Sequence, residues 1–177
     1  MKRENKKFKS EINYKLLLAL KFLLFFNLLS IPMYIVIYFN LSSLEFQKFV
    51  AFLSSSLLNI IGYKNSLIED EILIKVDDTI NSVYISWDST GWKSVYAIFS
   101  LILATPMVKI SRKIYHAAIL MPAVFFINIL RIITTIILSI YHNFLDFEFI
   151  HILLWRYLLI GTIILLWLIF LKRERII

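Results

Sequence analysis

Four basic side chains interrupt apolar stretches that are long enough to cross a bilayer: Lys21, Lys93, Arg131 and Arg156. A charged group in hydrocarbon is costly and by default indicates function. Lys21 lies near the start of its stretch, where the alkyl stem lets the ammonium group reach water. The other three basic groups need another explanation.

Polar groups from three predicted helices fall at one depth near the outer surface. At a rise of 1.5 Å per residue, Arg131 stands about 25 Å along a helix that begins near Ile114, and Arg156 lies about 7.5 Å deeper than His151. Convergent polar groups at one depth indicate a reactive or binding site; the alternative is an interhelical hydrogen-bond cluster with Arg–Asp pairing that only holds the bundle together. The polar residues at this depth are Asp88, Ser89, Lys93, Asn128, Arg131, His151 and Arg156.

Ser89 and Lys93 suggest one specific chemistry. They are four residues apart, so both would lie on one face of a helix. A serine beside a neutral lysine is the nucleophile and base of Ser–Lys proteases, and burial in lipid favours the neutral lysine. Such a spacing is also common by chance. No spacing of histidines or carboxylates predicts a metal site, and no cofactor is predicted.

The composition predicts a mostly α, polytopic membrane protein with a single membrane domain over residues 14–171. Of the 177 residues 60% are hydrophobic, mean hydropathy is +0.79, and glycine and proline number three each. Since a spanning helix needs about 20 apolar residues, four spans are expected, at about 14–39, 91–108, 114–141 and 149–171. Residues 44–61 have the polar and apolar pattern of an interfacial helix. The runs Glu71–Val76 and Ser82–Ser86, separated by a turn at Asp77–Thr79, predict a short β-hairpin.

The charges predict the orientation of these spans. Basic clusters mark the N-terminus (residues 1–13), the connection at residues 109–113 and the C-terminal tail (residues 172–177), whereas most acids fall in residues 40–90 and 142–148. The positive-inside rule then places both termini in the cytoplasm, residues 40–90 outside the cell, and the polar cluster at the outer face of the cell membrane. Basic residues distributed in this way do not form the single basic face of a nucleic-acid binder.

Three short motifs occur in order on this topology: Ser89-Thr90-Gly91 at the start of one span, Asn128-Ile129-Leu130-Arg131 within the next, and His151 at the start of the last. Together with the hairpin before Asp88, they resemble the exosortase/archaeosortase family of membrane transpeptidases. The resemblance covers about Leu44 to Leu171. In that family the first motif carries a cysteine where this chain has Ser89.

The resemblance implies a protease and transpeptidase that cleaves the C-terminal sorting signal of secreted proteins, which consists of a short motif, a hydrophobic helix and a basic tail. Residue 89 would form an acyl-enzyme, His151 would handle the proton, and Arg131 would stabilise the oxyanion. The acceptor amine is not encoded, and a membrane lipid is one candidate. Supporting or substrate-binding positions are Asp88, Thr90, Gly91, Lys93, Asn128 and Arg156, with Arg156 also an alternative to His151.

The serine at position 89 leaves three explanations open. An engineered exchange of cysteine for serine would inactivate the enzyme, and would also explain a chain with no cysteine. A natural serine enzyme would use Lys93 or His151 as its base. A natural pseudoenzyme would only bind substrate. We favour the first explanation, because a serine hydroxyl is a poor nucleophile without a well-placed base. The rival functions are the Ser–Lys intramembrane protease and a non-catalytic membrane scaffold.

Overall fold

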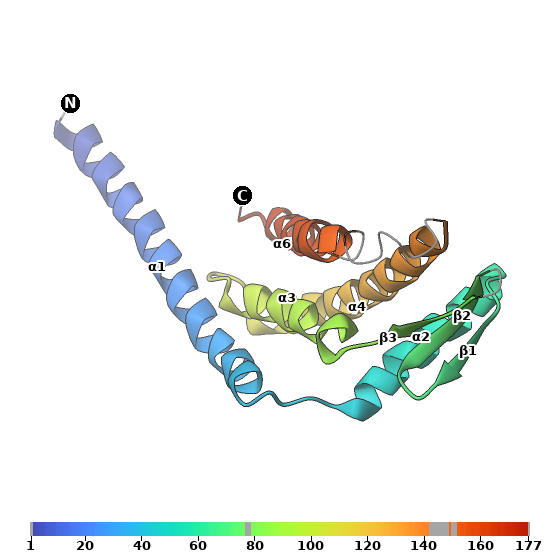
Figure 1. Cartoon of the computed structure of the whole chain (residues 1–177). Helices are drawn as coiled ribbons and strands as arrows, with labels where there is room; N and C mark the ends of the chain where they lie inside the picture. The colour runs from blue at the N-terminus through green and yellow to red at the C-terminus, as the bar shows by residue number, and fades with distance from the viewer. Residues whose placement is uncertain (1, 77–78, 142–148, 150–151, 177) are drawn as a thin grey trace.

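A computed structural model describes residues 2–76, 79–141, 149 and 152–176, without the side chains of residues 2–11, 76 and 154–156. The fold is mostly helical, as predicted (Figure 1). Its helices are α1 (Lys2–Tyr38), α2 (Leu44–Ile61), α3 (Trp92–Ala104), α4 (Ile110–Tyr141), and a π-helical segment (Leu154–Leu159) that continues as α6 (Ile160–Arg173).

Three described helices are long and apolar enough to cross a membrane by length and composition: Ile12–Tyr38 of α1, α2, and α4. These helices confirm a membrane protein. The predicted span 91–108 is a shorter apolar helix of 13 residues. Thr105 is the C-cap of α3, and the chain then turns before α4. The predicted span 149–171 falls partly outside the described residues. The interfacial placement of α2 stays a prediction.

The predicted hairpin is present, and a third strand extends it. Strands β1 (Asn65–Ile68), β2 (Glu71–Val76) and β3 (Thr79–Tyr84) form an antiparallel sheet in the order β1-β2-β3. β3 begins at Thr79 rather than at Ser82, with Ile72 opposite Val83. β1 was not predicted, since four residues give little alternation. It follows Gly62, whose positive φ of 102° ends α2 and turns the chain back along that helix.

The sheet packs on α2 and on the second half of α4. This core consists of Ile72, Ile74, Val83 and Ile85 from the sheet and its exit, Val50, Ala51 and Leu58 from α2, and Ile129, Ile132, Ile133 and Ile136 from α4. A second core joins α3 and α6 to the first half of α4, through Ile98, Ile102, Ala117, Val124, Ile163, Phe170 and Leu171. α4 therefore belongs to both cores, and its polar residues Asn128 and Arg131 lie in the part of the helix where the two cores adjoin.

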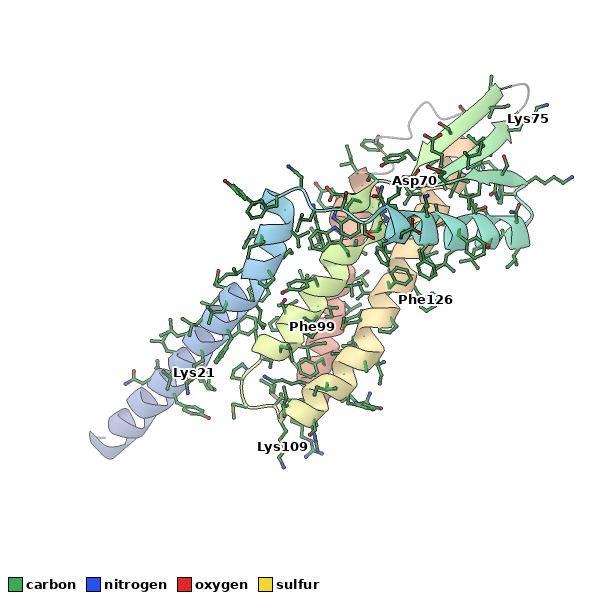
Figure 2. All side chains as sticks on the ribbon, turned by 90° about the horizontal axis from the view of Figure 1, so that it is seen from below. Lys21, Asp70, Lys75, Phe99, Lys109 and Phe126 are labelled. Carbon is green, nitrogen blue, oxygen red and sulfur yellow. The ribbon has the colours of Figure 1, made fainter. Side chains whose placement is uncertain are left out.

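α1 diverges from the rest of the fold and contacts it along one side only (Figure 1). The Tyr96 hydroxyl of α3 donates to the carbonyl of Leu29 at 2.7 Å, and Phe22 stacks on Trp167 of α6. Its many exposed leucines suit a lipid environment. In Figure 2, Lys21 and Lys109 lie toward one end of the helices and Asp70 and Lys75 toward the other. This separation is the one that the charge pattern predicts, and the assignment of the ends to the two membrane faces stays a prediction.

Candidate active site

A single 3-10 turn, Trp87–Thr90, joins the sheet to α3 and carries Ser89. Ile85 anchors the chain ahead of the turn: its side chain lies in the sheet core and its N–H donates to the carbonyl of Asp70 at 2.9 Å. Ser86 then caps the turn, because its hydroxyl and its carbonyl both accept from the N–H of Ser89. The Thr90 hydroxyl, fully buried, donates to the carbonyl of Trp87 at 2.7 Å. The turn is thus fixed by its own hydrogen bonds.

Gly91 is required where the turn meets α3. Its φ of 83° lies in the left-handed region, which favours glycine. A Cβ at this position would lie 2.6 Å from both Cγ and Nδ2 of Asn128, closer than real Cβ contacts occur. The missing side chain lets Asn128 approach the turn, and Nδ2 of Asn128 donates to the carbonyl oxygen of Ser89 at 3.0 Å. Asn128 therefore holds the backbone of the turn against α4.

Arg131 reaches the same carbonyl from the next turn of α4 and retains unused donors. Its Nη2 donates to the oxygen of Ser89 at 3.3 Å, and the residue is only 2% exposed. Its Nε and Nη1 are buried without a hydrogen-bond partner, and no carboxylate pairs with Arg131 among the described residues. A buried charge without a counter-ion is costly, so it is unusual as a purely structural feature.

A cavity of about 140 Å³ opens beside Ser89 and Arg131, between β3 and the second half of α4. Since a water molecule takes about 30 Å³ of liquid volume, the cavity has room for a few small groups such as a peptide carbonyl. Its lining is completed by Val83, Tyr84, Ile85, Ser86, Ile132, Thr135 and Ile136. Arg131 and Ser89 thus line one cavity.

The Ser89 hydroxyl lies 2.9 Å from the Ser86 hydroxyl, and Ser89 is 8% exposed. Lys93 pairs instead with Asp88, its Nζ 2.8 Å from the carboxylate on the outer edge of the site. The described partner of the Ser89 hydroxyl is Ser86, whereas a Ser–Lys protease needs the lysine as the partner of its serine. The contacts of Lys93 therefore do not support a Ser–Lys dyad.

The fold brings most of the predicted site residues together. Ser89, Thr90, Gly91, Asn128 and Arg131 meet at the turn, with Asp88 and Lys93 at its edge. His151 and the side chain of Arg156 lie outside what the structure describes, so their roles stay predictions. The described residues contain no group of histidines and carboxylates that could hold a metal ion.

Sequence reasoning missed Ser86. The available signal was a serine three residues before Ser89, directly after a β-prone run, which is the spacing of a capped turn. It also missed the ring contacts of Trp87, which stacks on Trp92 and meets the edge of Phe46 from α2.

One protein-family model matches this chain, the family described as transmembrane exosortase (Exosortase_EpsH), over residues 12–171. The match covers nearly the whole chain, including all three motifs named above. Searches of curated proteins and of solved structures found no match.

Proposed function

The chain belongs to the transmembrane exosortase family, whose members are membrane transpeptidases that act in protein sorting, and we propose that the turn at residue 89 is its acyl-transfer site. One observation carries the proposal: Arg131, whose guanidinium has two buried donor atoms without a hydrogen-bond partner, lines the same cavity as Ser89. Such an arrangement suits a site that stabilises a developing oxyanion, whose donors must be in place before the charge forms.

The proposed reaction starts from a thiolate at position 89. The sulfur attacks the scissile carbonyl carbon, and the carbonyl electrons move to oxygen, where N–H groups of Arg131 donate to the oxyanion. The C–N bond then breaks, and the leaving nitrogen takes a proton, for which His151 is the proposed donor. An acceptor amine attacks the resulting thioester, loses its proton and restores the thiolate. Asn128 positions the turn and takes no part in proton transfer.

In this proposal the Ser89 form binds substrate without turning it over. The hydrogen-bond partner of the Ser89 hydroxyl among the described residues is another hydroxyl, which is too weak a base to activate it. A thiol at the same position is a few per cent ionised at neutral pH and is intrinsically more nucleophilic. The chain is therefore proposed to be an inactivated form of a cysteine transpeptidase, with Ser89→Cys as the active form.

The proposed substrate is the C-terminal sorting signal of secreted proteins, and an apolar groove offers a place for its hydrophobic helix. The groove has a volume of about 690 Å³ and lies between α3 and α4, with Phe46 of α2 and Trp92 among its lining. Phe46 contacts Trp87 of the catalytic turn, so the groove approaches the site through these rings. A Phe side chain in place of Ala118, which lines the groove, should slow processing severalfold. Ile119→Phe is the matched control, because Ile119 is exposed on α4 and does not line the groove.

The orientation belongs to the same proposal: both termini in the cytoplasm and the turn at the outer face. Because the chain has no cysteine, single cysteines introduced at Lys75 and at Lys109 can be labelled without background. An impermeant thiol reagent should label the Lys75 position in intact cells and the Lys109 position only after permeabilisation. Labelling of both positions in intact cells would contradict the orientation.

The test of the function compares the Ser89 protein with Ser89→Cys. Each is co-expressed with a secreted reporter from the same genome that carries a hydrophobic, basic-tailed C-terminus, and the reporter size is followed on a gel. Processing only with Ser89→Cys supports the thiol transpeptidase. Processing with Ser89 establishes a serine enzyme. No processing by either protein, with both stably expressed, counts against the transpeptidase and favours a non-catalytic scaffold.

A further inference from the structure

Ser86 contacts both the backbone and the side chain of residue 89. It follows β3 by two residues, adopts an extended conformation (φ −65°, ψ 158°), and caps the turn through its hydroxyl, which accepts from the Ser89 N–H at 3.3 Å. The same hydroxyl lies 2.9 Å from Oγ of Ser89 and lines the same cavity. The cap alone would be satisfied by any side chain with a well-placed acceptor.

The contact between the two side chains has a chemical consequence. A hydroxyl has one donor and two acceptor lone pairs, so Ser86 can accept from the backbone and still donate to the atom at position 89. A donor aimed at a nucleophile stabilises the deprotonated form, in which the nucleophile reacts. The same contact restrains the rotamer of residue 89, which lines the cavity together with Arg131.

We propose that Ser86 is a positioning residue that orients the nucleophile at position 89 and stabilises its thiolate by donating a hydrogen bond to it. The proposal rests on the proposed function, in which residue 89 is the nucleophile. It adds to the first motif a hydroxyl three residues upstream, so that the proposed catalytic segment runs from Ser86 to Gly91. Because Ser86 acts before substrate binds, it can be tested without substrate.

The other charged groups around the turn are the same in every protein compared below. Arg131 faces the turn from α4, Asp88 lies on the turn itself, and Lys93 faces Asp88 from α3. Arg156 and His151 are also unchanged. A difference between variants at position 86 is therefore assigned to that side chain.

The experiment uses the full-length Ser89→Cys protein in detergent micelles, in which residue 89 is the single thiol. The rate of alkylation by iodoacetamide is measured from pH 6 to pH 9.5 by mass spectrometry, and the thiol pKa is taken from the profile. Three second-site variants are compared: Ser86→Thr keeps the hydroxyl, Ser86→Asp keeps a cap acceptor but brings a negative charge, and Ser86→Ala removes both the cap and the donor.

We expect Ser86→Ala to slow alkylation at pH 7 about tenfold, since a hydrogen bond to a charged group is worth about one unit of thiol pKa. Ser86→Asp should slow it further, because a neighbouring carboxylate disfavours the thiolate. Ser86→Thr should resemble the parent. A role as a cap alone predicts that Ser86→Ala and Ser86→Thr, which add no charge, keep the thiol pKa of the parent, whereas the carboxylate of Ser86→Asp raises it in either case.

Equal thiol pKa values in the parent and Ser86→Ala would overturn the proposal, and so would a parent thiol that stays unreactive over the whole pH range. If Ser86→Ala does not fold, superimposable profiles for the parent and Ser86→Asp would overturn it, because they would show that the side chain at position 86 does not reach the thiol. Alkylation needs no substrate, so the pH shift can appear when no reporter is cleaved. That result would contradict the transpeptidase and retain the role of Ser86. Cleavage of the reporter without the pH shift would retain the transpeptidase and contradict the role of Ser86.

Discussion

α4 carries two polar clusters that differ in how their charges are satisfied, one at its start and one in its second half; we name them inner and outer after the proposed orientation. In the inner cluster, Glu174 from the end of α6 accepts from Arg112 at 3.1 Å and lies 3.0 Å from Nε2 of His116. In the outer cluster, Arg131 donates to one backbone carbonyl and leaves two nitrogens without a partner. His116 and Arg131 are fifteen residues apart, or about 22 Å along the helix.

The difference separates a structural cluster from a site. Both carboxylate oxygens of Glu174 have a cationic or imidazole partner, and His116 also packs edge-on against Phe170, so the inner cluster fastens α6 to α4. In the outer cluster, Asn128 holds the turn against α4. Arg131 adds a buried charge that is not needed to hold the turn. A buried polar group that destabilises the fold without a structural role is typical of active sites, in which such groups bind the substrate.

The largest effect is expected from Arg131→Met in the Ser89→Cys protein. Loss of an oxyanion donor typically costs about 10²–10³ in rate, so reporter processing should fall at least a hundredfold. The melting temperature in detergent should not fall, because methionine fills similar space without a buried charge. The matched change is Arg112→Met in the inner cluster, which should leave processing within about threefold, since an exposed ion pair is worth little.

The Arg131→Met protein could instead melt at a lower temperature and lose activity only because less folded protein is present. That result would contradict the difference between the two clusters. Arg131 would then be structural in the same sense as Glu174.

Gly91→Ala is the next largest change, because it acts on the scaffold of the outer cluster. Strained φ and the contact with Asn128 should together cost about 1–3 kcal/mol of stability and most of the activity. Gly161→Ala in α6 is the matched control. Nothing lies within 4 Å of the added Cβ there, so it should be neutral or stabilising by up to about 1 kcal/mol.

A double variant, Gly91→Ala with Asn128→Ala, removes the two contacts at 2.6 Å, to Cγ and Nδ2 of Asn128. The Cβ of residue 128 stays 2.9 Å from the added Cβ and the strained φ also remains, so the variant should regain only part of the stability and no activity. Full recovery of stability would show that φ contributes nothing at this position.

The sequence predicted the helical membrane fold and the hairpin, for reasons that are local. Apolar runs and charge clusters define the helices, and Asn128 and Arg131 share a face because they are three apart. Residues 89–91 were brought to that face by a resemblance in motif order. The contact of Gly91 with Asn128 then gives a physical reason for the glycine.

Other features depend on contacts that residue spacing does not encode. Ser89 and Lys93 are one helical turn apart, but Ser89 lies in a 3-10 turn before α3 begins, and Lys93 turns to Asp88. The inner cluster joins residues about sixty positions apart, so no local pattern could predict it. Asn128 was predicted only as a supporting or substrate-binding position, and it holds the carbonyl of Ser89 directly.

Lys93→Met should have a small effect on processing by Ser89→Cys, within about threefold. Lys93 and Asp88 form an ion pair at the edge of the outer cluster, with side chains 31% and 59% exposed, and such pairs contribute about 0–1 kcal/mol. Asp88→Asn is the matched partner variant and should behave alike. A loss of a hundredfold with Lys93→Met would contradict this peripheral role and place the lysine in the catalytic machinery of the Ser89→Cys protein.

The smallest effect is expected in the inner cluster, as a change in the pH dependence of stability. The hydrogen bond from His116, and then those from Arg112, hold the pKa of Glu174 below its usual range, and partial burial opposes them. An ionised carboxylate only accepts, so Nε2 of His116 is the donor. Because the folded-state pKa is depressed, the stabilisation is complete above the unfolded carboxyl pKa of about 4.3, and is lost as the pH falls through the folded-state pKa.

Glu174→Gln removes this titration. The melting temperature in detergent should be lower than that of the parent at pH 6, and the two should converge as the pH approaches 3. Processing by the Ser89→Cys protein at pH 7 should be unchanged while the protein remains folded, since the cluster lies at the other end of α4. A constant difference in melting temperature from pH 6 to pH 3 would show that the charge of Glu174 does not contribute. Loss of processing by a folded Glu174→Gln protein would show that the two clusters are coupled through α4.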